Sequence, residues 1–138
     1  MGKVVRVADG DTLTILDATN VQHKVRLHGI DAPERKQAYG EASRKALAER
    51  VAGKVVRVEW TARDKYQRVL GTVYVGEKDI NLAMLQAGYA WHYKRFDSNA
   101  AYAQAEAEAK AAKRGLWRDP SPVAPWDFRQ QQKARSKQ

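Results

Sequence analysis

The chain has 138 residues, which is enough for one domain with its own hydrophobic core, and 43% of them are hydrophobic. Its net charge of +9 favours a polyanionic partner, with nucleic acid the first candidate and an anionic membrane the second, although a merely basic surface would carry the same charge. The absence of cysteine excludes disulfides and thiolate metal sites, and no apolar run is long enough to cross a bilayer.

The first third of the chain predicts three short strands, over residues 3–7, 12–16 and 21–27. Leu13 and Ile15 share one face of the second strand, and Asp11 falls on the same parity at the end of that strand. The Asp11 carboxylate is therefore expected at the rim of an apolar layer. Three short strands that meet at turns suggest a meander that begins a barrel.

The middle of the chain predicts a helix over residues 39–52, strands over 54–60 and 69–75, and a short helix over 79–87. A third helix begins after a cap at Asp97 or Ser98, runs to Arg114 and stops at Gly115. We therefore predict an α+β fold, a five-stranded OB-fold β-barrel with three α-helices.

The composition changes after Trp117, so we divide the chain into a domain over residues 1–118 and a basic tail over residues 119–138 that contains proline and tryptophan. Three prolines interrupt regular structure in this tail. Trp126 and Phe128 are expected to fold back onto the domain. Residues 129–138 are polar and basic, so we expect them to be disordered, and no role is assigned to the tail.

One stretch, from Arg26 to Glu34, places an arginine, two carboxylates and a turn within nine residues. Pro33 favours an extended Ala32, whose carbonyl then lies between the carboxylates of Asp31 and Glu34. Such hard oxygen donors suit Ca²⁺ or Mg²⁺, and the neighbouring guanidinium suits phosphate. Taken alone, the same residues are equally compatible with a strand followed by a solvated acidic turn.

Two further blocks favour the functional interpretation: Asp9-Gly10-Asp11-Thr12 and Asp64-Lys65-Tyr66-Gln67-Arg68. With the stretch from Arg26 to Glu34, these blocks stand in an order that resembles the staphylococcal nuclease (thermonuclease) family. Each block alone is weak, but three in order are a specific signal. The resemblance runs from about Val4 to Trp117 and implies Ca²⁺-dependent cleavage of phosphodiester bonds in DNA and RNA.

The resemblance also implies a role for each matching residue. Asp11 and Asp31 would supply side-chain ligands to the metal, and Ala32 would supply its backbone carbonyl. Arg26, Glu34 and Arg68 match catalytic positions, and Lys65 and Tyr66 match positions that contact a substrate phosphate. The sequence departs from the best-known member in having Ala32 for a threonine, Gln67 for a glycine and a shorter loop over residues 35–39.

Several of these residues have a second interpretation. Arg26 can form a structural salt bridge with Asp11 or Asp31, Lys65 can be a solvated loop residue, and Tyr66 can stack on a base or pack on the barrel. A set of aromatic residues after the second helix can line a base-stacking surface or pack in the core. This set consists of Trp91, His92, Tyr93 and Phe96.

The sequence therefore predicts a monomeric nuclease that acts on DNA and RNA, prefers single strands and leaves 3′-phosphate ends by endonucleolytic cleavage. Water is the expected nucleophile, and Glu34 orients it or takes its proton. The alternatives are a non-catalytic OB-fold module that only binds nucleic acid and a basic protein that coats membranes or packages nucleic acid. No signal peptide is evident, and a secreted or periplasmic location stays open if the chain is a mature fragment.

Overall fold

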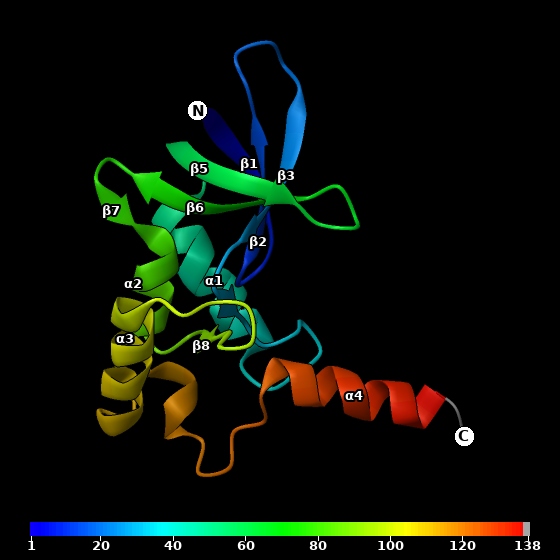
Figure 1. Cartoon of the computed structure of the whole chain (residues 1–138), viewed down its shortest axis with the longest axis vertical. Coiled ribbons are helices and arrows are strands. Elements are labelled where there is room, and N and C mark those ends of the chain that lie inside the picture. Colours follow the sequence, from blue (N-terminus) through cyan, green and yellow to red (C-terminus); the bar gives the residue numbers. More distant parts are fainter. Residues whose placement is uncertain (137–138) are drawn as a thin grey trace.

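Five strands close into a β-barrel in the computed structural model, which describes residues 1–136 (Figure 1). The sheet runs in the order β3-β2-β1-β5-β6, and a parallel pairing of β3 with β6 closes it. The strands are β1 (Gly2–Asp9), β2 (Thr12–Leu16), β3 (Gln22–Leu27), β5 (Val55–Arg63) and β6 (Val69–Val75). The predicted α+β OB-fold barrel is confirmed: β2 and β6 have the predicted ends, and the ends of the other three strands differ by at most three residues.

The barrel register brings the three sequence blocks together. In β3, Arg26 pairs with Thr12 of β2 on one side and with Leu70 of β6 on the other. The strand that carries Arg26 therefore lies between the turn that carries Asp11 and the loop that carries Arg68.

Helices cover one end of the barrel, below the strands in Figure 1. They are α1 (Gly40–Val51), α2 (Ile80–Gln86), α3 (Ala100–Ala111), the 3-10 turn η1 (Gly115–Arg118) and α4 (Pro125–Ser136). Three short strands complete the fold: β4 (Ile30–Asp31), which pairs with β8 (Trp91–His92), and β7 (Lys78–Asp79). The three predicted helices are confirmed, although Asn99, and neither Asp97 nor Ser98, caps α3. Within residues 1–136, no helix has the length and apolar character that a bilayer crossing requires.

The tail differs from its prediction. Where disorder was expected from residue 129, α4 forms a fourth helix, which projects away from the body of the molecule (Figure 1). Pro125 occupies its first turn, where a missing N–H costs nothing, and Lys133 and Arg135 lie near its C-terminal end, where positive charge is favourable. The part of the prediction that concerns residues 137–138 lies outside the described residues.

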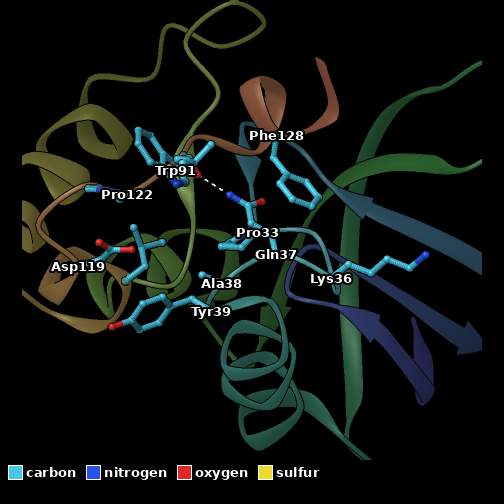
Figure 2. A pocket seen from close by; sticks show the side chains of 11 residues that line it. Pro33, Lys36, Gln37, Ala38, Tyr39, Trp91, Asp119, Pro122 and Phe128 are labelled. Atoms are coloured by element: carbon cyan, nitrogen blue, oxygen red, sulfur yellow. Dashed lines mark hydrogen bonds between the residues drawn. The ribbon is translucent and has the colours of Figure 1, made fainter. Parts of the chain in front are cut away.

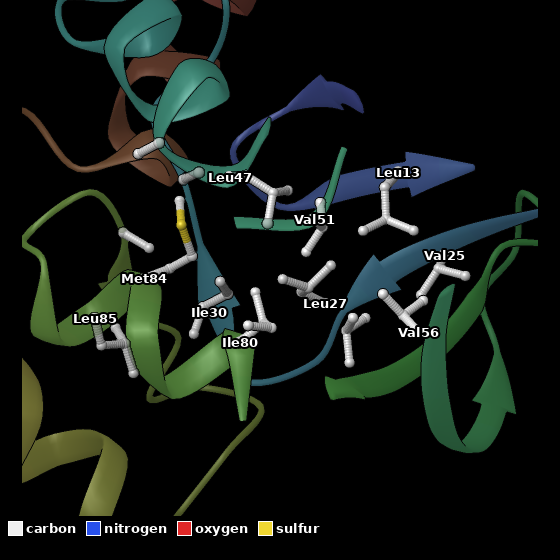
Figure 3. Close-up of a cluster of buried hydrophobic side chains, with 14 of the residues drawn as sticks. Leu13, Val25, Leu27, Ile30, Leu47, Val51, Val56, Ile80, Met84 and Leu85 are labelled. Atoms are coloured by element: carbon white, nitrogen blue, oxygen red, sulfur yellow. The ribbon is translucent and has the colours of Figure 1, made fainter. Parts of the chain in front are cut away.

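Between the barrel and the helices lies the main apolar core (Figure 3). Leu13, Val25 and Leu27 point inward from β2 and β3, and each is completely buried. Leu47 and Val51 of α1 and Met84 of α2 meet them from the helical side. At about 25 cal/mol for each Å² of apolar surface removed from water, this layer fixes the strands whose ends carry the polar residues described next.

Candidate active site

The turn between β1 and β2 holds Asp11 against the segment that carries Asp31. A Cβ on Gly10 would lie 2.8 Å from the Cβ atoms of Ala32 and Ser43, so only a residue without a side chain allows this approach. One carboxylate oxygen of Asp11 accepts a hydrogen bond of 2.7 Å from the backbone N–H of Ala32. The backbone of the turn and the backbone after β4 are thus joined through the Asp11 side chain.

Arg26 links both buried carboxylates. Its Nη2 lies 3.3 Å from Asp11 Oδ2 and 3.3 Å from Asp31 Oδ1. Its Nη1 donates to the backbone carbonyls of Leu27 and Ile30, at 2.7 and 2.8 Å. The structural salt bridge that the sequence left open is therefore present, and the same guanidinium also holds the turn between β3 and β4.

Burial and charge shift the acidity of these groups in different directions. Burial acts to raise the pKa of Asp11, but Arg26 and several hydrogen bonds outweigh it, so the pKa lies below its usual value. The pKa of Asp31 rises to about 6, chiefly because the carboxyl is buried, while Arg129 and Arg26 act in the opposite direction.

Asp9 is a third carboxyl at this end of the barrel and was not predicted as a site residue. Burial, together with the nearby charge of Asp11, raises its pKa to about 8. Its Oδ1 also accepts a hydrogen bond of 3.1 Å from the backbone N–H of Asp11. Its place in the Asp-Gly-Asp turn was the available signal, but strand parity and the family resemblance pointed to Asp11 alone.

Glu34 lies at the edge of the same cluster, on a turn that glycine makes possible. A Cβ on Gly40 would lie 1.9 Å from the Glu34 carbonyl oxygen, so the chain folds back tightly between these two residues. The Glu34 backbone N–H donates to the Gln37 side chain at 3.1 Å. The Glu34 side chain is 36% exposed, so it is partly open to solvent, whereas the Asp31 side chain beside it is buried.

Arg68 lies on the loop between β5 and β6 and forms no hydrogen bond or ion pair with Asp11, Asp31 or Glu34. Instead, its Nε donates to Asp64 at 2.6 Å. Arg68 immediately precedes β6, whose Leu70 pairs with Arg26, so the Cα atoms of the two arginines lie roughly 8 Å apart. The fold therefore places Arg68 near Arg26, while its carboxylate partner is Asp64.

Lys65 and Tyr66 form the tip of the same loop. Tyr66 is 66% exposed, and the cationic groups of Lys65 and Arg68 lie 5.2 and 5.4 Å from the centre of its ring. Tyr66 thus stands in solvent between two positive charges and does not pack on the barrel.

The predicted metal ligands form a small set of hard oxygen donors. The carboxylates of Asp11 and Asp31 converge on one Arg26 nitrogen, so a single cation contacts both of them in the structure. This donor chemistry fits Ca²⁺ or Mg²⁺. Among residues 1–136, no group of three or more His, Cys, Asp and Glu side chains is arranged as a metal cluster, so a bound ion would depend on backbone carbonyl, water or substrate oxygens as well.

A further residue at this site, which the sequence did not indicate, comes from α4. Arg129 Nη2 lies 2.6 Å from Asp31 Oδ2, and Arg129 Nη1 lies 2.7 Å from Glu34 Oε1. Beside this contact is a pocket of about 230 Å³ between the loop at residues 33–39 and the segment that leads into α4 (Figure 2).

The aromatic residues that were open to two interpretations pack mainly against aromatic residues elsewhere in the chain. Trp91 meets Trp117 edge to face, with ring centres 4.5 Å apart, and Tyr93 stacks on Trp126 with ring centres 5.4 Å apart. Phe96 contacts Tyr93 but is 59% exposed. Trp91 and Tyr93 therefore anchor the C-terminal segment, while His92 packs against Tyr102 of α3.

Comparison with known proteins agrees with this arrangement. A family model described as "Staphylococcal nuclease homologue" matches residues 24–119. An "uncharacterized endonuclease" of Haemophilus influenzae is 45% identical over 131 residues, which cover 95% of this chain and 74% of that protein. An "uncharacterized endonuclease" of Escherichia coli is 43% identical over 93% of this chain and 84% of that protein. A "probable staphylococcal-like nuclease" of Oryza sativa subsp. japonica is 38% identical over 95% of this chain but only 33% of its own length.

Proposed function

Since this chain belongs to the staphylococcal nuclease family and is a nuclease, we propose that it is a Ca²⁺-dependent endonuclease that hydrolyses phosphodiester bonds in DNA and RNA. The observation that supports this proposal best is the convergence of Asp11 and Asp31 on Arg26, at 3.3 Å each, with the partly exposed Glu34 side chain at the edge. A structural salt bridge needs one carboxylate, whereas a site for a cation and a phosphate needs several acids beside arginine.

Asp11, Asp31 and the carbonyl of Ala32 would hold the Ca²⁺ ion. When bound, the ion neutralises charge on a phosphate oxygen and makes the phosphorus more electrophilic. Because two carboxylates and a carbonyl are few ligands for Ca²⁺, we expect weak binding that strengthens when substrate is present.

Glu34 would position the attacking water or accept its proton. A general base must have its carboxylate within reach of water, and the Glu34 side chain is the most accessible of these three acids, at 36% exposed against 8% for Asp11 and 1% for Asp31. Attack of the water oxygen on phosphorus forms a P–O bond while the bond to the 5′ oxygen breaks. That oxygen leaves with a proton, and the phosphate stays on the 3′ side.

Arg26 and Arg68 would stabilise the negative charge that builds on the phosphoryl oxygens. Arg26 lies in β3 and Arg68 immediately precedes the neighbouring strand β6, which suits two donors on one phosphate. A fixed donor of this kind contributes about 3–4 kcal/mol to lowering the barrier. Lys65 and Tyr66, exposed on the loop beside Arg68, would contact an adjacent phosphate or base.

The charge of +9 favours contacts with the backbone of nucleic acid, which carry little sequence information. We therefore propose slight sequence preference, action as a monomer and faster cleavage of single strands.

The experiment is to incubate the protein with denatured and duplex DNA and with RNA, in Ca²⁺ or in excess chelator, and to follow fragment length and the chemistry of the new ends. The proposal predicts shortening only in Ca²⁺, faster on denatured DNA, with 3′-phosphate ends. Retarded mobility without shortening in any divalent ion would instead support a module that only binds nucleic acid.

A further inference from the structure

The C-terminal helix places a third arginine directly on the acids of the proposed metal site. The Arg129 guanidinium spans both oxygens of Asp31, at 3.2 Å to Oδ1 and 2.6 Å to Oδ2. The same group reaches Glu34 Oε1 at 2.7 Å. Arg26 also lies 3.3 Å from Asp31 Oδ1, so this oxygen contacts two guanidinium groups.

Packing of the first turn of α4 fixes the position of Arg129. Trp126 stacks on Tyr93 with ring centres 5.4 Å apart and meets Trp91 edge to face. Just before the helix, the carbonyl of Val123 accepts a hydrogen bond from the Gln37 side chain, drawn as a dashed line in Figure 2. Phe128 lines the pocket of Figure 2 together with Pro33, the residue before Glu34.

The rest of α4 is different, because every residue from Gln130 to Ser136 is exposed. Arg129 therefore contacts Asp31 from the last part of α4 that packs against the rest of the protein. The Arg129 side chain is 38% exposed and the Asp31 side chain 1%, so the guanidinium lies over the carboxylate on its solvent side.

A guanidinium fork and a divalent cation compete for the same carboxylate oxygens, and two positive charges at one carboxylate repel each other. We propose that Arg129 is an internal competitor of Ca²⁺: its ion pair with Asp31 and Glu34 is an autoinhibitory contact that Ca²⁺ must displace. This inference rests on the proposed function, because it takes Asp31 as a ligand of the ion. A chain cut before α4 would bind the ion more readily.

The experiment is a calorimetric titration of the full chain with Ca²⁺, in the absence of nucleic acid. It compares the wild type with Arg129→Gln and with the matched control Lys133→Gln. Lys133 lies one helical turn beyond Arg129 and is exposed, and its substitution removes the same charge from the same helix. Circular dichroism verifies that each variant is folded.

Competition predicts that Arg129→Gln binds Ca²⁺ about tenfold more tightly, equivalent to about 1.4 kcal/mol, while Lys133→Gln binds as the wild type does. Equal or weaker binding by Arg129→Gln overturns the inference, and so does equal tightening in both variants, which would indicate only the loss of general charge. If the wild type cleaves only in Ca²⁺ but Arg129→Gln has wild-type affinity, this inference fails and the proposed function stands. If no variant binds Ca²⁺ and the wild type does not cleave, both fail.

Discussion

Replacing each site arginine by lysine separates a structural from a catalytic role, because the two arginines are held differently. Arg26 donates from Nη1 to two backbone carbonyls, at 2.7 and 2.8 Å, and its side chain is 14% exposed. Arg68 has a single ion-pair partner, Asp64, and its side chain is 29% exposed. Lysine keeps the charge at either position but cannot reproduce the fork.

The magnitudes follow from these contacts. A hydrogen bond to a charged group contributes about 1.5–3 kcal/mol, and lysine can restore only one of the two bonds to the carbonyls, so Arg26→Lys should lose about 2–3 kcal/mol of unfolding free energy. Arg68→Lys gives up a partly exposed ion pair, which is worth roughly 0–1 kcal/mol. Both variants should cleave denatured DNA about 10²–10³-fold more slowly, because each loses a bidentate phosphate donor.

The assays are urea denaturation followed by tryptophan fluorescence and single-turnover cleavage in Ca²⁺ under conditions in which all variants are folded. Two results would refute the reasoning. If Arg26→Lys unfolds at the wild-type urea concentration, its bonds to the Leu27 and Ile30 carbonyls do not hold the turn. If Arg26→Lys is destabilised but cleaves at the wild-type rate, Arg26 is a structural residue only.

Three further substitutions test how the site is built. Gln67 has a backbone φ of +65°, a region that costs non-glycine residues about 1 kcal/mol, so Gln67→Gly should raise the urea midpoint, and a lowered midpoint would contradict this. Gly10→Ala places a Cβ 2.8 Å from the Ala32 Cβ and should lower the free energy of unfolding, measured in urea, by about 1–3 kcal/mol. Wild-type stability would show instead that the turn can move. The raised pKa of Asp9, about 8, means that the folded protein keeps a proton that the unfolded chain releases, so this contribution to stability is complete below pH 3.8 and is lost as pH rises to about 8. Asp9→Asn should therefore raise the free energy of unfolding by at least about 1 kcal/mol at pH 9 in chelator. The variant should also lose part of the pH dependence of stability between pH 3.8 and about 8, and an unchanged pH profile would refute the raised pKa of Asp9.

Local patterns in the sequence were sufficient to predict the barrel. Alternating apolar residues placed Leu13 and Ile15 on one face of their strand, with Asp11 at the rim of that layer, and all three are buried in the structure. The family resemblance carried by the ordered blocks assigned Arg26, Asp11 and Asp31 to one site. The register of β3, in which Arg26 pairs with the residue after Asp11, explains why these side chains meet.

Contacts between distant segments could not be predicted in the same way. Arg129 is 98 residues from Asp31 along the chain, and nothing in the polar sequence around it indicates a carboxylate partner. The helix that carries it was predictable in principle, since Pro125 begins it, Asp127 lies in its first turn and basic residues lie in its last. The neighbouring prolines made that segment look irregular, and the stacking of Trp126 on Tyr93 that supports the helix is a tertiary contact.

The central claim is that the acid and arginine cluster cleaves the phosphodiester bond, and the most direct measurement is the single-turnover cleavage rate of Glu34→Gln on denatured DNA in saturating Ca²⁺. Glu34 is suited to this test because its carboxylate forms an ion pair with Arg129 in which both side chains are partly exposed, so the substitution should not unfold the protein. Glu108→Gln, a change of the same kind on the exposed face of α3, is the matched control. A loss of at least about 10²-fold for Glu34→Gln with a wild-type rate for Glu108→Gln is the predicted result. A wild-type rate for Glu34→Gln would contradict the account.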